Sequence, residues 1–340
     1  MFSWPTEGPQ VGEVSEAAII RAFVDPRGTP QAWVDNGDDA AIFAPSGGRG
    51  VVVTTDDFVE DVHFTRRLIS PEGLGSRLVA VNVSDVAAMG ARPRHLFLSV
   101  ALPTHLSVAA VEALARGLHR RCQAEDVTVL GGNVSRSPGP IFLSATLTGE
   151  VEAKRWVPRT GARVGDEVWM SGTPGRAAAG LAVALQHGPP QPRDPAWNLY
   201  EAWASPPSRV ALALRLAEAS LLRAMCDVSD GLGTDLPRLL GELGAELEAG
   251  ALIVEPAVAA VAAREGLDPI GFAVSGGEDY ELLMIADPDA RTALESAAAE
   301  LQVPLRRLGR VRESSGVVLK GPKGLRPVGP GHDHFGGLTS

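Results

Sequence analysis

Five short acidic segments stand beside glycine or other small residues, most of them at the end of an apolar run. They are Gly37-Asp38-Asp39-Ala40, Thr54-Thr55-Asp56-Asp57, Asn82-Val83-Ser84-Asp85, Asp227-Val228-Ser229-Asp230-Gly231 and Gly276-Gly277-Glu278-Asp279. A carboxylate in such a place is poorly solvated unless a cation joins it. Oxygen-only ligands favour Mg²⁺, and clustered Mg²⁺ ions usually serve a polyphosphate. Any one segment could instead be a turn or a helix cap, but the five together predict shared metal sites.

The length and composition of the chain limit its class. A chain of 340 residues is too long for one typical hydrophobic core and suits two domains of ordinary size. No apolar run reaches the roughly 18 residues that a membrane span needs, and the first residues lack the pattern of a secretory signal. The two cysteines, Cys122 and Cys226, cannot build a disulfide framework or a zinc site. We therefore expect a cytoplasmic protein with no membrane partner.

The charge of the chain constrains its partners. The formal net charge of −10 argues against a nucleic-acid partner, because binding to a phosphate backbone needs a surplus of basic residues. The only lysines are Lys154, Lys320 and Lys323, and no Gly-x-x-x-x-Gly-Lys-Ser/Thr segment is present, which excludes a P-loop. If the chain handles nucleotide phosphates, metal ions and arginines must neutralise them.

The first half of the sequence alternates strand-like and helix-like segments. Strands are expected at residues 50–55, 95–102, 127–130 and 141–151, and helices at residues 74–89 and 107–123. The first strand would deliver Asp56 at its tip. In the first helix Asp85 shares a face with the apolar Val81 and Ala88. Asp85 therefore points inward, which is costly unless the carboxylate is paired.

The second half repeats this alternation after a basic connector at residues 154–159. Strands are expected at residues 167–170, 224–227, 280–285, 306–311 and 317–320, and helices at residues 174–185, 206–219 and 288–301. The similar layout of the two halves predicts a mixed α/β fold of two related modules, residues 1–150 and 151–340, each with an acidic turn at a strand end.

Several weaker motifs each have two interpretations. Gly131-Gly132-Asn133 could let backbone amides approach a phosphate, or could form a tight turn after a short strand. Residues 171–175 could bind an anion where a helix opens, or could be an ordinary strand-to-helix turn. Residues 276–279 could equally cap a helix or strand. His63 could donate to a phosphate or be structural, and the pair at residues 332 and 334 could bind a metal or lie in a solvated tail.

Together, these segments resemble the thiamine-monophosphate kinases, which belong to the aminoimidazole-ribonucleotide-synthetase-like superfamily of ATP-using proteins. The specific parts of the resemblance are the Asn-Val-Ser-Asp-Val-Ala-Ala-Met-Gly-Ala segment at residues 82–91 and the Ser-Gly-Gly-Glu-Asp-Tyr-Glu-Leu segment at residues 275–282. The Gly-Asp-Asp at residues 37–39 is common to the superfamily. The motifs run in order over almost the whole chain, ending with Asp-His-Phe at residues 333–335.

The resemblance implies direct, Mg²⁺-assisted transfer of the γ-phosphoryl group of ATP to thiamine monophosphate, giving thiamine diphosphate with no general base. The residues that would hold several Mg²⁺ ions are Asp39, Thr54, Thr55, Asp56, Asp85, Asn133, Asp227 and Asp230. Those that would bind ATP are Gly132, Asn133, Arg159 and Ser229, and those that would bind the substrate are His63, Ser275 and Glu278. The family forms a homodimer through its N-terminal, ATP- and Mg²⁺-binding modules, whose sheets close into a shared barrel.

The sequence departs from the family pattern at several positions. Asn133 stands where an aspartate is common, Asp57 and Asp61 stand where threonine and glycine are usual, and Gly329 stands where an aromatic residue packs on the substrate. Two alternatives to this kinase stay open. One is another enzyme of the superfamily that uses ATP to activate a different oxygen, and the other is a catalytically degenerate nucleotide-binding subunit.

Overall fold

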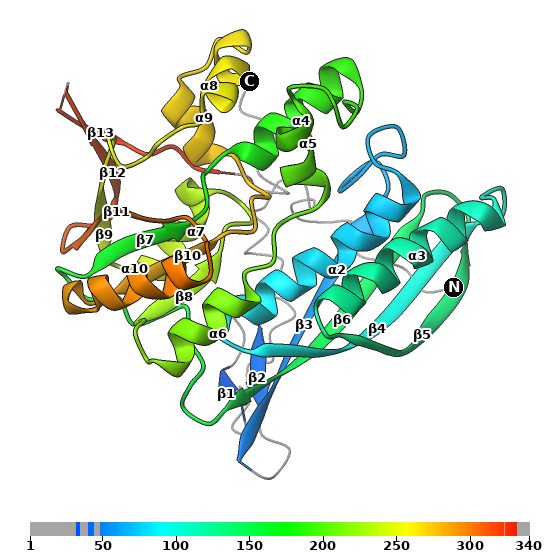
Figure 1. Cartoon of the computed structure of the whole chain (residues 1–340), viewed down its shortest axis with the longest axis horizontal. Coiled ribbons are helices and arrows are strands. Elements are labelled where there is room, and N and C mark those ends of the chain that lie inside the picture. Colours follow the sequence, from blue (N-terminus) through cyan, green and yellow to red (C-terminus); the bar gives the residue numbers. More distant parts are fainter. Residues whose placement is uncertain (1–31, 35–39, 44–47, 323, 332–340) are drawn as a thin grey trace, which may run out of the picture.

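The computed structural model describes residues 32–34, 40–43, 48–322 and 324–331. Their strands form two sheets, with helices packed on them and between them (Figure 1). The first sheet has the order β1-β2-β3-β6-β4-β5, and its neighbours are antiparallel except for β4 and β5. Its strands are β1 (Ala32–Val34), β2 (Ala41–Phe43), β3 (Arg49–Val59), β4 (Arg92–Pro103), β5 (Thr128–Ser137) and β6 (Phe142–Glu152).

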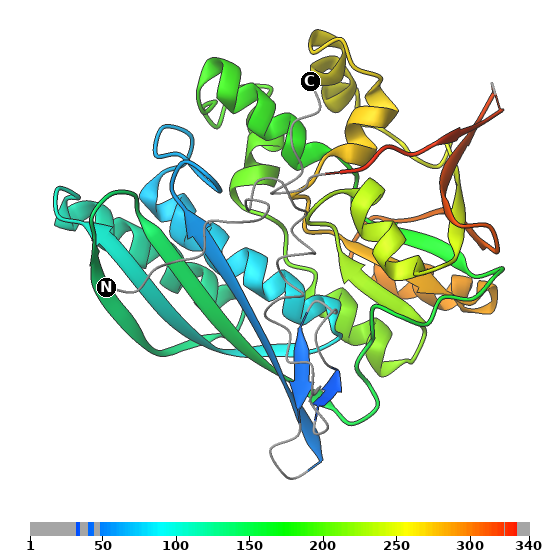
Figure 2. The same cartoon turned by 180° about the vertical axis from the view of Figure 1, so that it is seen from behind.

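Two helices, α2 (Pro71–Ala88) and α3 (Val108–Ala124), cover one face of the first sheet (Figure 1). Ser70 and Ser107 cap them, because each hydroxyl accepts from a backbone N–H in the first turn. The helices cross so closely that a Cβ on Gly117 would lie 1.8 Å from the carbonyl oxygen of Glu72. Figure 2 shows the other face of the sheet, which the helices of the described chain leave open.

The second sheet has seven strands in the order β13-β12-β9-β11-β7-β10-β8. Its neighbours are antiparallel except for β9 and β12. The strands are β7 (Glu167–Ser171), β8 (Ala224–Asp227), β9 (Gly244–Glu248), β10 (Leu282–Ala286), β11 (Leu305–Arg312), β12 (Gly316–Gly321) and β13 (Gly324–Pro327).

Both faces of strands β7, β8 and β10 of the second sheet are buried. Trp169, Met225 and Met284 pack on one side with helices α6 and α10, while the alternate residues of the same strands pack on the other side with α7. The helices of this half are α4 (Arg176–His187), α5 (Trp197–Ala204), α6 (Val210–Glu218), α7 (Leu232–Leu240), α8 (Pro256–Arg264), α9 (Pro269–Ser275) and α10 (Arg291–Glu300), the last preceded by the short turn η2 (Pro288–Ala290).

Helix α2 joins the two halves. Its C-terminal residues Ala87 and Ala88 belong to the same apolar cluster as Leu212, Leu216 and Met225 of the second half. The helix therefore packs against β3 and β6 on one side and against α6 and β8 on the other. Among the described residues, no helix is both long enough and apolar enough to cross a membrane.

The predicted elements with strong periodicity are confirmed, and the mixed α/β fold with two sheets is as expected. Two strand ends were predicted wrongly. Strand β5 continues to Ser137, so Gly131-Gly132-Asn133 lies inside a strand and not in a turn after it. Strand β3 continues to Val59, so Asp56 lies within the strand and not at its tip. Helices α5, α7, α8 and α9 and strands β1, β2, β9 and β13 were not predicted.

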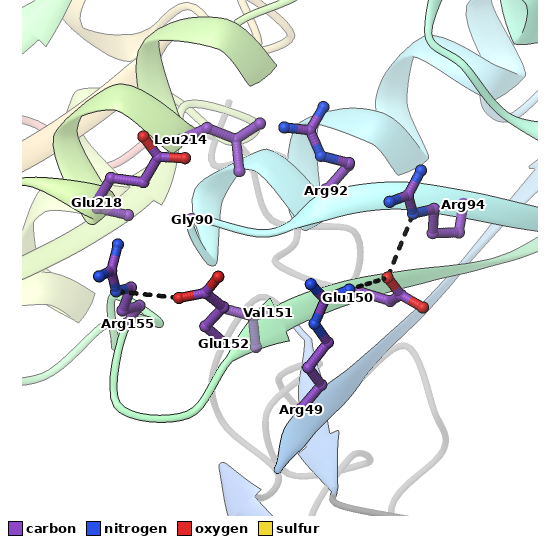
Figure 3. A pocket seen from close by; sticks show the side chains of 11 residues that line it. Arg49, Gly90, Arg92, Arg94, Glu150, Val151, Glu152, Arg155, Leu214 and Glu218 are labelled. Carbon is purple, nitrogen blue, oxygen red and sulfur yellow. Dashed lines mark hydrogen bonds and ion pairs between the residues drawn. The ribbon is translucent and has the colours of Figure 1, made fainter. Parts of the chain in front are cut away.

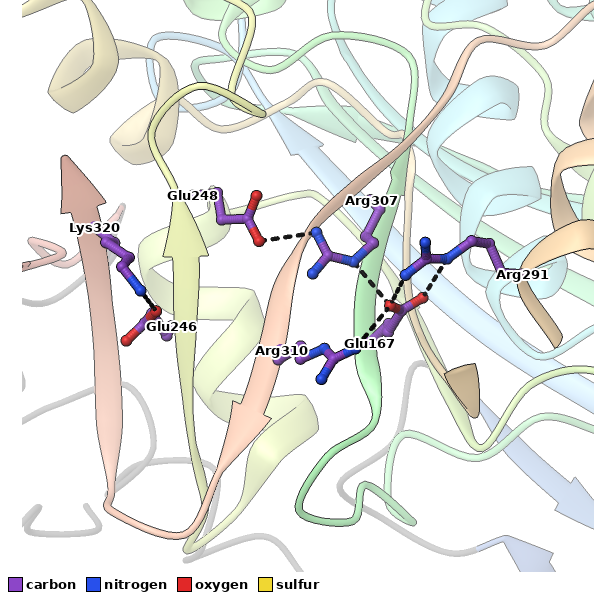
Figure 4. A network of polar contacts seen from close by, with 7 residues as sticks. All are labelled: Glu167, Glu246, Glu248, Arg291, Arg307, Arg310 and Lys320. Carbon is purple, nitrogen blue, oxygen red and sulfur yellow. Dashed lines mark hydrogen bonds and ion pairs between the residues drawn. The ribbon is translucent and has the colours of Figure 1, made fainter. Parts of the chain in front are cut away.

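A buried carboxylate links strand β7 to strand β11 and helix α10 (Figure 4). Glu167 at the start of β7 is fully buried and accepts hydrogen bonds from Arg291 of α10 and Arg307 of β11. Burial alone would raise the pKa of Glu167, but these two arginines hold it below its ordinary value. Nearby, Lys320 of β12 and Glu246 of β9 form a more exposed pair at 2.8 Å.

We predict that Glu167→Gln lowers the free energy of unfolding by about 1.5–3 kcal/mol, because the fully buried carboxylate loses its charge-assisted hydrogen bonds from Arg291 and Arg307, which themselves remain partly exposed to water. The matched change Glu246→Gln should cost less than about 1 kcal/mol, since water screens that pair. Urea unfolding of both variants checks the difference. Equal losses would show that the buried network adds nothing beyond a surface ion pair.

Candidate active site

The Asn-Val-Ser-Asp segment of α2 reaches both halves of the protein. Thr54 of β3 donates to Asp85 Oδ2 at 2.6 Å, which confirms that Asp85 points inward and is paired. One residue earlier on the helix, Ser84 donates to Asp227 Oδ2 of β8 at 2.5 Å. Adjacent residues of one helix thus bind polar groups of the two sheets and bring three carboxylate-bearing elements together.

Burial and neighbouring charges raise the pKa of two acidic side chains at this junction. Burial, and then the charge of Asp57, raise the pKa of Asp56 to about 6. Burial raises the pKa of Asp227 to about 7, against the hydrogen bond from Ser84, and the charges of Asp235 and Asp56 add to the rise. Since Asp56 and Asp227 come from different sheets, the effect of the Asp56 charge on Asp227 indicates that the junction brings them near each other. Ionised acids in such a place are stabilised by a cation.

The donor set at the junction fits a hard cation but is incomplete in the described ranges. Its members offer oxygen atoms only, as Mg²⁺ requires. Within residues 32–34, 40–43, 48–322 and 324–331, however, no three aspartate, glutamate, histidine or cysteine side chains converge closely enough to hold a metal ion. The predicted ligand Asp39 lies outside the described residues, as do the residues 332–335 motif and its two histidines.

Asp230 lies on the loop between β8 and α7, where arginine holds it in place. Arg238 donates to Asp230 Oδ2 at 2.6 Å and to Asp235 Oδ1 at 3.1 Å. Asp235 in turn accepts from the backbone N–H of Asp230 at 3.0 Å. The charge of Arg159 acts on both Asp227 and Arg238, so this predicted ATP contact lies beside the same loop.

A cleft of about 690 Å³ opens between the two halves at this junction. It is lined by the end of β3 and the loop after it, the loop between β8 and α7, the turn before β10, and α4 and α5. Six of the predicted site residues line it, namely Asp56, His63, Ser229, Asp230, Ser275 and Glu278. Leu181 and Leu185 of α4 give the cleft an apolar wall. The cleft therefore combines an acidic region with an apolar one.

His63 is oriented by its own loop. Its Nδ1 accepts a hydrogen bond from the backbone N–H of Val59 at 3.1 Å, and its ring stacks on Phe58. An Nδ1 that accepts leaves Nε2 as the nitrogen that carries the proton of the neutral ring. His63 can therefore present an N–H group, as the predicted contact with a phosphate requires.

The turn at residues 276–280 sends its two acids in opposite directions. Asp279 is buried and accepts from the backbone N–H groups of Gly175 at 2.6 Å and Ala177 at 2.9 Å, so it caps α4. The anion at this helix start is thus the protein's own carboxylate, and residues 171–175 form an ordinary strand-to-helix turn. Glu278, whose φ of 68° is left-handed, lies on the wall of the cleft.

Gly132 and Asn133 are not brought to the cleft within one chain. The register places Asn133, Ser99, Ser144 and Asp57 in one row across β5, β4, β6 and β3. Three strand spacings separate the ends of this row, which is about 14 Å. Asp57 therefore cannot directly replace the carboxylate that Asn133 lacks in the same chain. Thr55 also turns away from the acids, because its hydroxyl donates to the carbonyl oxygen of Ala145.

A second hollow, of about 170 Å³, lies at the other end of β3 and β6 (Figure 3). Its arginines are largely paired within it, as Arg94 is with Glu150 and Arg155 with Glu152. None of the predicted site residues that the structure describes lines it. The cleft between the halves is therefore the candidate active site.

Several residues that shape the cleft were missed from the sequence. Ser84 had a signal, because it belongs to the conspicuous Asn-Val-Ser-Asp segment. Trp203 and Tyr280 line the cleft, and Arg77 lies behind Glu278. Nothing in the sequence around Arg77 or Trp203 marked them, since an arginine in a helix is usually exposed and a tryptophan usually belongs to the core.

Comparison with known proteins shows to which family the chain belongs. Residues 37–151 match the family described as AIR synthase related protein, N-terminal domain, and residues 163–321 match its C-terminal domain. The thiamine-monophosphate kinase of Bacillus subtilis is 31% identical over 304 residues, which cover 87% of this chain and 92% of that protein. The enzyme of Aquifex aeolicus is 34% identical, with 83% and 88% covered. The chain belongs to the thiamine-monophosphate kinase family.

Solved structures agree with this assignment. AaThiL complexed with AMPPCP and TMP superposes with a TM-score of 0.81 at 31% identity, covering 95% of this chain and 98% of that chain. The hydrogenase maturation protein HypE of E. coli superposes with a TM-score of 0.69 at 20% identity, covering 83% of this chain and 86% of that chain, which shows a shared fold alone.

We predict that, in the absence of divalent cations, the free energy of unfolding of Asp227→Asn rises relative to that of the wild type as the pH is raised from 5 to 8. The folded pKa of about 7 exceeds the ordinary 3.8, so this group's contribution to stability is fully present below pH 3.8 and is lost as the pH approaches 7. Asparagine cannot ionise, so the contribution of this side chain to stability does not change with pH in the Asp227→Asn variant. Thermal unfolding across this pH range checks the prediction, and a difference between the proteins that does not change with pH would contradict it.

Proposed function

We propose that this protein transfers the γ-phosphoryl group of ATP to thiamine monophosphate, giving thiamine diphosphate and ADP. The observation that carries the proposal is a single cleft between the two halves, in a member of this kinase family, lined by both predicted sets of contacts. Asp56, Ser229 and Asp230 mark the predicted ATP end, and His63 and Glu278 mark the predicted substrate end. Both reactants can therefore meet in one place.

The residue inventory suits this reaction. The attacking group is a phosphate monoester, which is already ionised near neutral pH and needs no general base. The obstacle is repulsion between two anions, and bound Mg²⁺ would neutralise their charge and align them. We propose that Asp56, Asp85 and Asp227 hold Mg²⁺ together with Asp230, Thr54 and Asp39, without Thr55, whose hydroxyl is turned to Ala145. The oxygen-only donor set and the raised pKa values of Asp56 and Asp227 support this assignment.

The remaining contacts follow from position. We propose that Ser229 and Arg159 bind the nucleotide, because both belong to the region around the loop that follows β8. His63, with its Nε2–H, and Ser275 would contact the thiamine-phosphate. The apolar wall of α4 would cover its rings, in a site where Gly329 offers no aromatic side chain.

We also propose that the two predicted domains, residues 1–150 and 151–340, act as a homodimer whose first sheets close into a shared barrel. The open face of the first sheet supports this, because it exposes Phe97 and the edge strand β5. Gly132 and Asn133, which are remote from the cleft of their own chain, would then reach the nucleotide of the partner. The cytoplasmic location expected from the sequence remains a prediction.

Release of ADP from ATP, measured with and without thiamine monophosphate and Mg²⁺, tests the proposal. The proposed kinase releases ADP only when both are present. ATP binding without ADP release would favour a degenerate nucleotide-binding subunit. ADP release that ignores thiamine monophosphate but responds to a different acceptor would favour another enzyme of the superfamily.

We predict that Asp85→Asn keeps the fold but lowers kcat by at least about a hundredfold, because a carboxylate that would hold Mg²⁺ loses its charge. Asp126→Asn is the matched control, since its side chain is 82% exposed and lies outside the cleft. ADP-release kinetics and thermal unfolding of both variants check the prediction. Near-normal turnover in Asp85→Asn would remove Asp85 from the metal site.

We predict that His63→Ala raises the KM for thiamine monophosphate about tenfold and changes the KM for ATP little, because the lost N–H contacts only the acceptor. His119→Ala, an exposed change on α3, should alter neither value. A rise in the KM for ATP instead would mean that the two ends of the cleft are assigned the wrong way round.

A further inference from the structure

We infer that Arg77 and Trp203 are positioning residues that fix the Glu278 carboxylate as the recognition group for the cationic, N–H-bearing rings of the substrate. This inference rests on the proposed function and adds residues that do not themselves bind the substrate. It assigns the selectivity of the cleft for thiamine monophosphate to a three-residue contact between the two halves of the chain.

Each oxygen of the Glu278 carboxylate has its own donor. Arg77 Nη2, from α2, donates to Oε1, and Trp203 Nε1, from α5, donates to Oε2 at 3.0 Å. The guanidinium also lies over the Trp203 ring, with Cζ 4.9 Å from its centroid, and 5.8 Å from the centroid of Tyr280. A carboxylate held at both oxygens cannot rotate, so its remaining lone pairs have fixed directions.

The backbone of this turn is held just as firmly. Glu278 and Tyr280 have φ values of 68° and 49°, a left-handed conformation that is unfavourable for residues other than glycine. The N–H of Glu278 donates to the carbonyl oxygen of Ser229 at 2.7 Å, and that of Tyr280 to Val228 at 2.9 Å. Strain of this kind persists only where the surroundings impose it, and it occurs at functional sites.

Arg77 would lower the stability of the protein if its role were only to pack in the interior. Its side chain is 1% exposed, and its Nε and Nη1 groups have no hydrogen-bond partner among the described residues. Buried donors without partners destabilise a protein, and an apolar side chain at this helix position would avoid the loss. Among the described residues, the one side-chain hydrogen bond that Arg77 donates goes to Glu278. Its position is therefore explained by what it does for that carboxylate.

The Glu278 side chain is about one-third exposed, at 33%, and this exposed part lies on the wall of the cleft. Arg77 does not line the cleft, and Trp203 shows only 1% of its surface there. Thiamine monophosphate carries an amino group on its pyrimidine ring and a positive charge on its thiazolium ring. A fixed carboxylate can accept from the first and complement the second, and the two positioning residues act only through it.

The experiment compares Trp203→Phe with Trp169→Phe. Both tryptophans are 1% exposed, but Trp169 Nε1 makes no hydrogen bond within the described part of the chain, so its replacement removes no contact of this kind. Trp203→Phe should weaken thiamine monophosphate about tenfold, equivalent to about 1.4 kcal/mol, both in KM and in Kd from calorimetry. The KM for ATP should stay within about twofold, and Trp169→Phe should change neither value. Arg77→Lys, which keeps the charge, should show the same selective loss.

A second comparison tests whether the two residues act through Glu278. In a Glu278→Ala background, Trp203→Phe should cause less than a twofold further change, because the carboxylate that it positions is gone. A full tenfold further loss, equal losses for both substrates, or equal effects at Trp203 and Trp169 would each overturn the inference. If the wild type binds thiamine monophosphate but releases no ADP, the proposed kinase function fails, and the Kd values still decide the inference. If the wild type does not bind it, both fail.

Discussion

The structure depends on carboxylates gathered where its two halves meet. Asp56 and Asp227 come from different sheets, and burial raises the pKa of each toward neutrality. Two such acids repel each other once ionised, so they remain together only if neighbouring groups hold them. Hydrogen bonds from Ser84 to Asp227 and from Thr54 to Asp85 supply part of this restraint. Because Ser84 and Asp85 are adjacent on α2, the position of this helix relates the two halves.

A small number of elements also forms the cleft. One turn, at residues 276–280, places Asp279 on the N-terminus of α4 and Glu278 on the opposite side, at the cleft. The capped helix then forms the apolar wall with Leu181 and Leu185. Acids at the predicted nucleotide end and apolar groups at the predicted acceptor end thus follow from how α2, α4 and this turn pack together. Phosphoryl transfer needs this division, since charge has to be neutralised at one end and water kept out at the other.

Much of the fold could be predicted because its longer elements have clear periodicity. The helix expected at residues 74–89 is α2, and the inward direction of Asp85 followed from its spacing to Val81 and Ala88. Shorter elements failed for physical reasons. Helix α7 contains Pro237, and helices α8 and α9 each begin with proline and span only seven to nine residues, too few for a periodic pattern. Gly131-Gly132 signalled a turn because glycine is unfavourable inside strands, but β5 is an edge strand that tolerates it.

The site was predicted less completely than the fold. The types of its acids could be recognised, but the opposite directions of Glu278 and Asp279 depend on a left-handed backbone that no periodicity reveals. The distance between Asn133 and Asp57 depends on the order of strands in the sheet, which places β6 and β4 between them. Arg77 could not have been chosen, because its role depends on contacts with residues more than a hundred positions away.

Phosphorus NMR of the full chain with ATP, thiamine monophosphate and Mg²⁺ most directly tests phosphoryl transfer within the cleft. Direct transfer predicts that the monoester signal is replaced by the two coupled signals of a diphosphate, at the same rate as ADP forms. Formation of ADP and inorganic phosphate with an unchanged monoester signal would contradict it, because water and not thiamine monophosphate would then be the acceptor.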